Sequence, residues 1–242
     1  MVLGAVPVKK FAKRAGIFKR GRMKKIKCLV TAGATREYFD PVRFISNPST
    51  GKMGWFVAEA AKNAGWDVVL VMGPSQLPAI DGVRTIGVVS AQDMLRACLK
   101  EFDDCHVLIM SAAVSDVRPK FVAAQKVKKG DIDLNPQLER TPDILLELSK
   151  RKRNQVVIGF AAETTDVENY AKAKMAEKKL DAIVANDVSA KGVGFASDFN
   201  KISIYLPDAE AFSPPLDTKK NLAMAIVDCA AGLIEKKRAG KA

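Results

Sequence analysis

The stretch IKCLVTAGATREYFDPVRFISNPSTGKMG, residues 26–54, decides the fold of this 242-residue chain. It opens with a short apolar segment, residues 26–31, which is typical of a buried strand. A loop over residues 32–50 follows, and a helix then begins near Gly51 and is expected to end before Gly65. Strand-to-helix connections in α/β proteins usually take ~2–6 residues. A connection this long in this position is typical of a functional loop.

The rest of the chain repeats the alternation of strand and helix. Apolar runs predict strands at residues 67–72, 83–88, 106–112, 155–160 and 180–185, with a further strand at 131–138 and an edge strand at 201–206. Helices are expected from the capping box Ser90–Asp93 to about Phe102, from an N-cap at Thr141 to about Lys150, from the capping box Thr165–Glu168 to near Lys179, and over residues 218–236. This order predicts an α/β, Rossmann-like doubly wound fold, whose mainly parallel sheet has helices on both faces. Such sheets bind ligands at the carboxyl ends of their strands.

Composition argues against several classes of site. Apolar residues make up 48% of the chain, enough for a sizeable core, and no apolar run reaches the ~18 residues of a membrane span. His106 is the only histidine, and the four cysteines (Cys28, Cys98, Cys105 and Cys229) are scattered. A zinc site, a Ser-His-Asp triad and a Cys-His pair are therefore disfavoured. Unpaired cysteines favour a reducing compartment, and we expect a cytoplasmic protein.

The net charge of +12 resides at the two ends of the chain. Residues 1–27 hold ten Lys/Arg and no acid, and residues 233–242 hold four bases and one acid, which leaves 25 bases and 26 acids in between. A nucleic-acid-binding domain would carry a basic face of its own, so this distribution argues against nucleic acid as a partner. Residues 1–22 are compatible with a targeting segment, a flexible basic arm or a disordered extension. We favour the extension, followed by a single domain over residues 23–242.

The long loop ends in NPSTGKMG, residues 47–54, at a helix N-terminus. Backbone N–H groups, the helix dipole, two hydroxyls and a lysine would together form a phosphate cradle. The residues of that cradle are Ser49, Thr50, Gly51 and Lys52. The alternative is an ordinary Ser/Thr cap with glycines that serve packing. The segment is not a Walker A loop, because Met53 follows the lysine, and it lacks the glycines of a dinucleotide fingerprint. A nicotinamide cofactor is therefore disfavoured.

Lys174 and Lys178 lie four residues apart on one helix face. Like charges at this spacing cost about 0.2–0.5 kcal/mol, and an anion between them would reverse the sign. The alternative is two lysines that snorkel at the edge of the core, and spacing alone leaves both open. Tyr170 and Lys174 also match the YxxxK spacing of short-chain dehydrogenases, but the glycine motif which that family needs is missing.

Residues 118–130, RPKFVAAQKVKKG, contain five bases and no acid, and they follow Asp116 just beyond a predicted buried strand. A charge run is usually a solvated loop. This position instead favours a mobile flap, in which Lys126, Lys128 and Lys129 would neutralise a polyphosphate. Composition and spacing thus indicate a nucleotide or another phosphorylated ligand, and they do not name a reaction.

From residue 27 to about 236 the chain resembles phosphopantothenoylcysteine synthetase in its bacterial and archaeal form. The matching segments are TAGATREYFDPVRFISNPSTGKMG (31–54), SAAVSDVRP (111–119), KVKK (126–129), TPDIL (141–145), GFAAET (159–164) and AND (185–187). The resemblance implies a ligase of coenzyme A biosynthesis. The carboxylate of 4′-phosphopantothenate attacks the α-phosphate of CTP to give an acyl-cytidylate and pyrophosphate, and the amine of L-cysteine then displaces CMP.

The resemblance also implies roles for individual residues. Asn47 would hold the acyl-nucleotide, Arg43 would support that site, and Lys126 would lie on the triphosphate. Asp116 would serve both the nucleotide and Mg²⁺. The nucleotide-binding set is Ser111, Ala112, Ala113, Asp116, Lys126, Glu139, Arg140, Thr141, Pro142, Phe160, Lys174 and Lys178.

Three expectations about the whole protein accompany the resemblance. The family forms dimers, so we expect a homodimer with the loop and the flap near the subunit boundary. Only 26 residues precede the matching region, so we expect neither the fused decarboxylase nor its FMN. The motif ISNPSTGKMG favours CTP over the ATP that the metazoan enzyme accepts. Thr50 and Ser115 are conservative departures from the serine and alanine that are frequent in the family.

Overall fold

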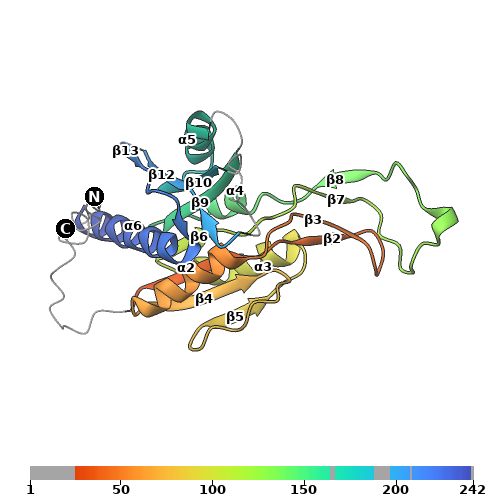
Figure 1. Cartoon of the computed structure of the whole chain (residues 1–242), viewed down its shortest axis with the longest axis horizontal. Helices are drawn as coiled ribbons and strands as arrows, with labels where there is room; N and C mark the ends of the chain where they lie inside the picture. Colours follow the sequence, from red (N-terminus) through yellow and green to blue (C-terminus); the bar gives the residue numbers. More distant parts are fainter. Residues whose placement is uncertain (1–24, 164–166, 188–196, 208, 241–242) are drawn as a thin grey trace, which may run out of the picture.

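The computed structural model describes residues 25–163, 167–187, 197–207 and 209–240 (Figure 1). Its centre is one eight-stranded sheet. The strands are β1 (Lys27–Ala32), β4 (Asp67–Met72), β5 (Arg84–Gly87), β6 (Val107–Met110), β9 (Val156–Glu163), β10 (Ala182–Asp187), β12 (Ile202–Leu206) and β13 (Ala209–Phe212). The expected basic extension, residues 1–22, lies outside the described residues.

The strand order is β13-β12-β10-β9-β6-β1-β4-β5, and all neighbours from β5 to β10 are parallel. The six parallel strands have the order of a Rossmann sheet, with β1 at the centre. β12 and β13 extend the sheet as antiparallel neighbours of β10. The predicted doubly wound, mainly parallel sheet is therefore confirmed. The prediction that residues 201–206 form the edge was wrong, because β13 pairs outside them.

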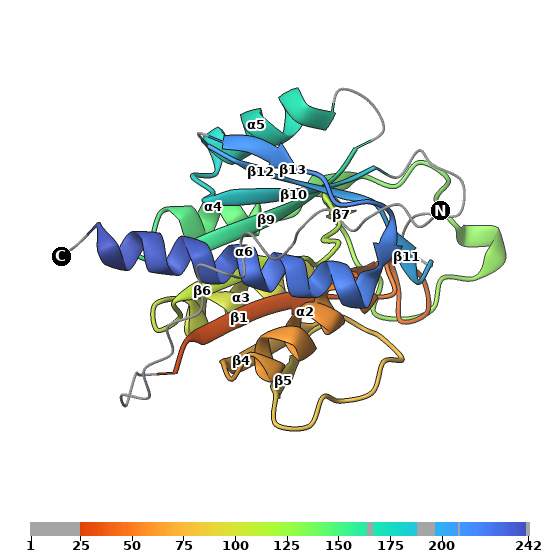
Figure 2. The same ribbon diagram turned by 60° about the vertical axis from the view of Figure 1, so that its left-hand side comes forward.

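Helices cover both faces of the sheet (Figure 2). The helices are α2 (Lys52–Asn63), α3 (Ala91–Phe102), α4 (Ile144–Ser149), α5 (Val167–Glu177) and α6 (Lys219–Ala239). Alternate residues of β1 enter different cores, because successive side chains of a strand point to opposite faces. Val30 packs with α2 and α6, whereas Leu29 packs with α3, α4 and α5. Both faces of β1 are thus buried, as its continuous apolar character predicted.

Local chemistry explains where two of these helices begin. At α3, the Ser90 hydroxyl accepts the Asp93 N–H while the Asp93 carboxylate accepts the Ser90 N–H, which confirms the predicted capping box. At α2, Gly51 is the N-cap and has a φ of 82°, a left-handed conformation that favours glycine. One turn later, a Cβ on Gly54 would lie 2.6 Å from the Ala32 Cβ. The glycines of NPSTGKMG therefore serve the turn and the close contact between α2 and β1.

Two short hairpins form an arm that projects from the body (Figure 1). One pairs β2 (Arg36–Tyr38) with β3 (Phe44–Ser46), and the other pairs β7 (Val117–Pro119) with β8 (Leu138–Arg140). The long loop after β1 is thus itself a hairpin. The predicted strand at 131–138 was wrong, because only Leu138 of that range belongs to a strand and Lys129–Asp131 forms a single 3₁₀ turn. Its alternating pattern, DIDLNPQL, is interrupted by Pro136 and is fully exposed.

The remaining differences concern helix ends. The N-cap of α4 is Asp143, whose side chain accepts the Leu146 N–H, and not Thr141 as predicted. Thr141 instead donates its hydroxyl proton to the Ser115 carbonyl. At α6, Thr218 is the N-cap, so the helix begins one residue after the predicted start at 218. Thr165 of the second predicted capping box lies outside the described residues. Two-residue strands β11 (Phe199–Asn200) and β14 (Asp217–Thr218) pair just before α6. Within the described part of the chain, no helix has the length and apolar character that crossing a membrane requires.

Candidate functional site

The candidate site lies at the carboxyl edge of β1 and β6, where the order of the sheet reverses. The chain runs from β1 to β4 on one side and later returns to β6 on the other. Beyond the strands, the Ala113 N–H donates to the Gly33 carbonyl at 2.8 Å, and the Thr35 N–H donates to the Ala113 carbonyl at 3.3 Å. A reversal of strand order leaves a crevice that binds ligands in open α/β sheets. Ser111, Ala112 and Ala113 lie at this point, as predicted.

Asn47 lies at this edge and contacts the loop that follows β6. Its amide nitrogen donates to the Ala113 carbonyl at 3.3 Å and to the Val114 carbonyl at 3.0 Å, so the loop after β3 is fastened to the loop after β6. An asparagine amide has two N–H bonds, and in this geometry each faces a backbone carbonyl. Hydrogen bonding to a substrate oxygen therefore requires release of one of them, and the longer bond to Ala113 is the weaker.

A second group of predicted residues reaches the same edge through hydrogen bonds of Thr141. The Thr141 hydroxyl donates to the Ser115 carbonyl at 2.5 Å, and its N–H donates to the Asp116 carbonyl at 3.1 Å. The Glu139 carboxylate accepts a hydrogen bond from Arg118 at 2.8 Å across the β7–β8 hairpin. Residues 139–142 and Asp116 are therefore brought together, as expected from sequence, although Glu139 already has an internal partner.

The lysine pair of α5 has an internal anion that sequence reasoning missed. Lys178 Nζ lies 2.7 Å from the Asp143 carboxylate, and Lys174 Nζ donates to the Phe160 carbonyl at 3.2 Å. Burial alone raises the pKa of Asp143, but the hydrogen bond from Lys178, the Leu146 N–H and the charge of Lys174 bring that pKa below its usual value. The anion beside Lys178 is therefore supplied by the protein itself, which neither alternative of the sequence analysis considered.

At the predicted phosphate cradle, residues 49–52, the lysine is already paired with an acid of the protein. Ser49 and Thr50 accept the N–H groups of Gly51 and Lys52 at 3.3 and 3.5 Å, which is long for such bonds. Lys52 Nζ lies 2.6 Å from the exposed Asp198 carboxylate and lowers the pKa of that group. Asp198, an acid that the sequence analysis did not consider, therefore neutralises part of the positive charge at the start of α2.

A buried lysine beside this helix start was also missed. The Lys219 side chain is only 3% exposed at the first turn of α6, and its N–H donates to the Asp198 carbonyl at 2.9 Å. Burial lowers the pKa of Lys219, and the charge of Lys52 lowers it further. The sequence signal was the pair Lys219-Lys220 directly after a threonine N-cap.

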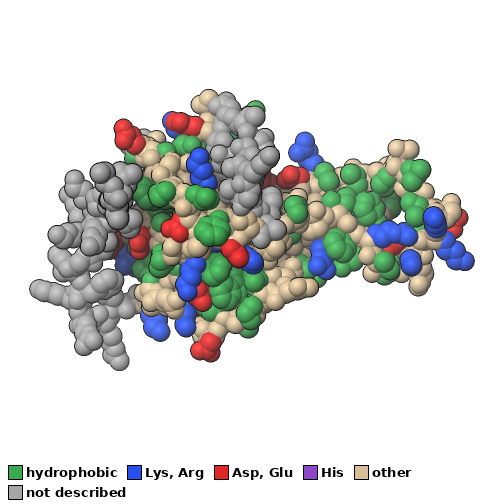
Figure 3. All heavy atoms as spheres, viewed as in Figure 1, with side chains coloured by type: hydrophobic (Ala, Val, Ile, Leu, Met, Phe, Trp, Pro, Cys, Tyr) green, Lys and Arg blue, Asp and Glu red, His purple; other side chains and the backbone are tan. Residues whose placement is uncertain are grey.

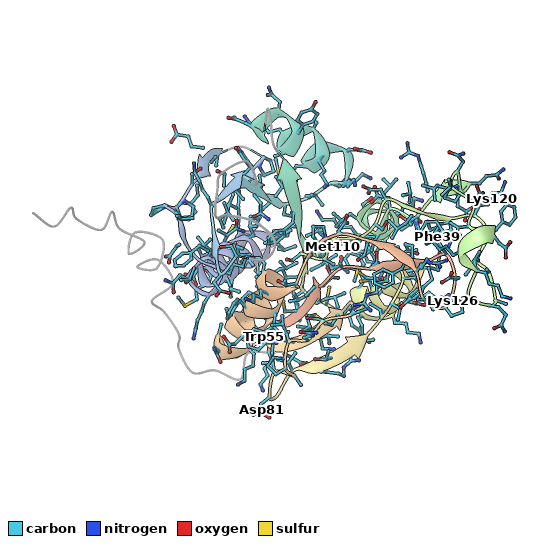
Figure 4. The ribbon with its side chains drawn as sticks, turned by 45° about the vertical axis from the view of Figure 1, so that its right-hand side comes forward. Phe39, Trp55, Asp81, Met110, Lys120 and Lys126 are labelled. Atoms are coloured by element: carbon cyan, nitrogen blue, oxygen red, sulfur yellow. The ribbon has the colours of Figure 1, made fainter. Side chains whose placement is uncertain are left out.

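Lys126 does not lie in the body of the protein. Figure 4 shows it on the arm, together with Phe39 and Lys120, and away from Trp55 near the start of α2. Arg43 connects the two halves of the arm, because one guanidinium nitrogen contacts Asp40 at 3.0 Å and the other donates to the Val127 carbonyl at 3.2 Å. The structure therefore brings Arg43 next to the flap, and it separates Lys126 from Lys52.

The remaining candidates are outside this site. His106 precedes β6, and its Nδ1 accepts the Lys27 N–H at the amino edge of the sheet, opposite to the candidate site. Tyr170 is 57% exposed on α5, and the Lys174 of its YxxxK spacing is bound to Phe160. In the described ranges, no three His, Cys, Asp or Glu side chains gather as metal ligands. Asp116 is a single exposed carboxylate.

Known proteins and solved structures resemble this chain over most of its length. The model of the DNA/pantothenate metabolism flavoprotein C-terminal domain matches residues 23–233. A coenzyme A biosynthesis bifunctional protein CoaBC of Bacillus subtilis (strain 168) is 46% identical over 206 residues, which are 85% of this chain and 51% of the relative. The protein of that name from Vibrio vulnificus (strain YJ016) is 46% identical over 202 residues, 82% of this chain and 50% of the relative. The chain thus spans about half the length of these curated relatives. The crystal structure of the C-terminal domain of a CoaBC protein matches with a TM-score of 0.76 and 42% identity, and covers 88% of this chain and 98% of the other.

Proposed function

The chain belongs to the DNA/pantothenate metabolism flavoprotein C-terminal domain family, and from this premise we propose that it is a phosphopantothenate–cysteine ligase acting in coenzyme A biosynthesis. The single observation that carries the proposal is the attachment of Asn47 to the carbonyls of Ala113 and Val114. It brings the loop that ends in NPSTGKMG and the loop SAAVSD together at the point where a Rossmann sheet binds ligands. The unit proposed to carry this function is residues 23–242.

In the first step, the carboxylate of 4′-phosphopantothenate attacks the α-phosphorus of CTP. A P–O bond to the acyl oxygen forms, the bond to the β-phosphate oxygen breaks, and pyrophosphate leaves. Such a step depends on positioning and on neutralisation of developing negative charge. We assign the triphosphate to Lys126 and to the backbone of Ser111–Ala113, the base to residues 139–142, and the substrate phosphate to Ser49–Lys52. Phe160, Lys174 and Lys178 are assigned as further contacts of CTP.

In the second step, the amine of L-cysteine attacks the acyl carbon and CMP leaves, which forms the amide. We assign Asn47 to the acyl oxygen and Arg43 to the support of that site. The exposed position of Asn47 supports this role, since its amide has only to exchange the long bond to Ala113 for one to the substrate. Among the described residues, the only histidine lies at the other edge of the sheet, so we route no proton transfer through imidazole.

Mg²⁺ fits the donors at this edge. Magnesium commonly takes one or two carboxylates and completes its shell with substrate phosphates and water, so a lone exposed Asp116 suffices. We propose that Asp116 holds it beside the nucleotide phosphates, where the ion would neutralise their charge. We also propose a cytoplasmic location, which is supported by four cysteine thiols that are free within the described part of the chain.

We further propose a homodimer that forms through the arm. Large apolar side chains are exposed along it, including Phe121 at 72%, Val122 at 61% and Leu134 at 86% (Figure 3). A protruding apolar surface of this kind is typical of an interaction site. Lys126 lies on the same arm. In such a dimer, Lys126 of one subunit would reach the candidate site of the other subunit. Light scattering should give a dimer for the wild type and a monomer for Leu134→Asp, and a wild-type monomer would contradict the proposal.

Pyrophosphate release tests the function directly. Purified protein is given CTP or ATP with Mg²⁺, with and without 4′-phosphopantothenate. We expect release that requires phosphopantothenate and prefers CTP, and amide formation once L-cysteine is added. Equal rates with CTP and ATP would reject the choice of nucleotide, whereas no release with either would reject the ligase. Reduced and oxidised nicotinamide cofactors should not bind in a fluorescence titration.

A further inference from the structure

Asp40 is a buried carboxylate in the turn between β2 and β3 that no step above uses. Its side chain is 0% exposed although it lies on the projecting arm. One oxygen accepts the N–H groups of Val42 and Arg43, both at 2.8 Å, and so closes the turn. The other oxygen points across to the second hairpin. A buried charge is costly unless it is paired with an opposite charge and hydrogen-bonded. The Asp40 carboxylate is both.

The second oxygen of Asp40 and the guanidinium of Arg43 hold one residue of the flap, Val127, by both of its backbone polar groups. Asp40 Oδ2 accepts the Val127 N–H at 3.2 Å, and Arg43 Nη2 donates to the Val127 carbonyl at 3.2 Å. Arg43 Nη1 binds Asp40 Oδ2 at 3.0 Å, so the ion pair itself is fixed. Val127 therefore has both its donor and its acceptor held by a single charged pair from a hairpin 87 positions away in sequence.

A further contact restrains the flap on the same side. The Ala123 N–H donates to the Phe39 carbonyl at 2.8 Å, directly before Asp40. The segment from Ala123 to Val127 thus runs along the turn of the first hairpin, and Figure 4 shows Phe39 and Lys126 together on the arm. Lys126 itself is exposed. Its backbone is consequently fixed on both sides while its ammonium group faces outward.

We propose that Asp40 is a positioning residue which, through the backbone of Val127, presents Lys126 to the triphosphate. The inference rests on the proposed function for the role of Lys126, and on geometry alone for the clamp. It assigns Arg43 a second duty, because the same guanidinium holds the flap. One part of the basic flap is then held in place, because residues 123–127 are anchored to the first hairpin. Only residues 128–130 of the flap are left to move.

Asp40→Asn tests the clamp selectively. Asparagine keeps one oxygen to accept the two N–H groups of the turn, but it places an NH₂ group against the Val127 N–H and the guanidinium. We expect exchange of the Val127 amide, followed by NMR on the free protein, to accelerate about tenfold or more, the equivalent of one charge-assisted hydrogen bond. The matched control is Asp133→Asn, an exposed carboxylate of the loop after the flap, which accepts the nearby Asn135 N–H. It should leave Val127 unchanged.

Arg43→Lys provides a second variant if Asp40→Asn folds poorly. It keeps a positive charge beside Asp40 and loses the fork that reaches the Val127 carbonyl, so Val127 exchange should accelerate by a smaller factor. Unchanged Val127 exchange in a folded Asp40→Asn protein would overturn the clamp.

A double-mutant cycle on CTP affinity, measured by calorimetry, tests the connection to Lys126. Asp40→Asn should weaken CTP binding about tenfold in the wild-type background and hardly at all in the Lys126→Gln background, because residues that act through one another are not additive. Equal weakening in both backgrounds would show that Asp40 acts without Lys126 and would overturn the proposal. If the wild type binds neither CTP nor ATP, the proposed function fails and the role of Lys126 fails with it, whereas the exchange rates still decide the clamp.

Discussion

Lys178 Nζ lies 2.7 Å from Asp143 Oδ2, and this contact joins the end of α5 to the N-cap of α4. The same carboxylate caps α4 by accepting the Leu146 N–H at 3.0 Å. One side chain therefore fixes two helices beside the carboxyl end of β9, where Phe160 and Lys174 also meet. The protein's own charges therefore hold this corner of the candidate site in place.

Acid should weaken this corner. Because the folded-state pKa of Asp143 is below its unfolded value, ~3.9 for a free aspartate, its contribution to stability is fully present above that unfolded value. The contribution is lost as the pH falls through the folded pKa. Asp143→Asn retains a good N-cap and loses the charge. The gap between the urea midpoints of wild type and variant should thus be largest near neutral pH and should shrink below about pH 4. A constant gap down to pH 2 would contradict this account.

Asn47→Asp should separate the two half-reactions. The variant should still release pyrophosphate from CTP and phosphopantothenate, because activation does not use the Asn47 amide, and it should form little amide product. An aspartate there also faces the carbonyls of Ala113 and Val114 without a proton to donate. We expect a loss of about 0.5–1.5 kcal/mol in stability from the lost hydrogen bonds, which a thermal melt would reveal. Equal loss of both half-reactions in a folded variant would count against the assigned role.

Lys126→Gln should block the first half-reaction. Loss of the ammonium leaves developing charge on the triphosphate unneutralised, and removal of one such donor typically costs about 10²–10³ in rate. Pyrophosphate release is the measurement. The control is Lys120→Gln, which removes the same charge from another exposed lysine of the arm. An equal loss of pyrophosphate release in both variants would indicate that the overall positive charge of the arm matters, and not a specific contact of Lys126.

Much of the body could be predicted from the sequence, and the arm could not. Apolar runs such as DVVLVM and QVVIGF predict buried strands, because both faces of such strands are covered. The Ser90–Asp93 capping box can be predicted because it needs only local geometry. The strands of the arm have three residues each, too few to display an alternating pattern. Asp40 and Asp143 act through partners far along the chain, Val127 and Lys178, so no local motif identifies them. The pattern Thr141-Pro142-Asp143 predicts an N-cap at the threonine, but the Thr141 hydroxyl instead donates to the distant Ser115 carbonyl.

The contact between α2 and β1 gives a prediction about stability. Gly54→Ala should destabilise the protein by about 1–3 kcal/mol, because the new Cβ would lie 2.6 Å from the Ala32 Cβ and 2.8 Å from the Thr31 carbonyl oxygen at the carboxyl end of β1. Gly232→Ala in α6 is the matched control, since a Cβ there meets nothing within 4 Å. That change should stabilise by about 0.5–1 kcal/mol through helix propensity alone. Urea denaturation gives both values. If Gly54→Ala were as stable as Gly232→Ala, the packing of α2 on β1 would not explain the glycine at position 54.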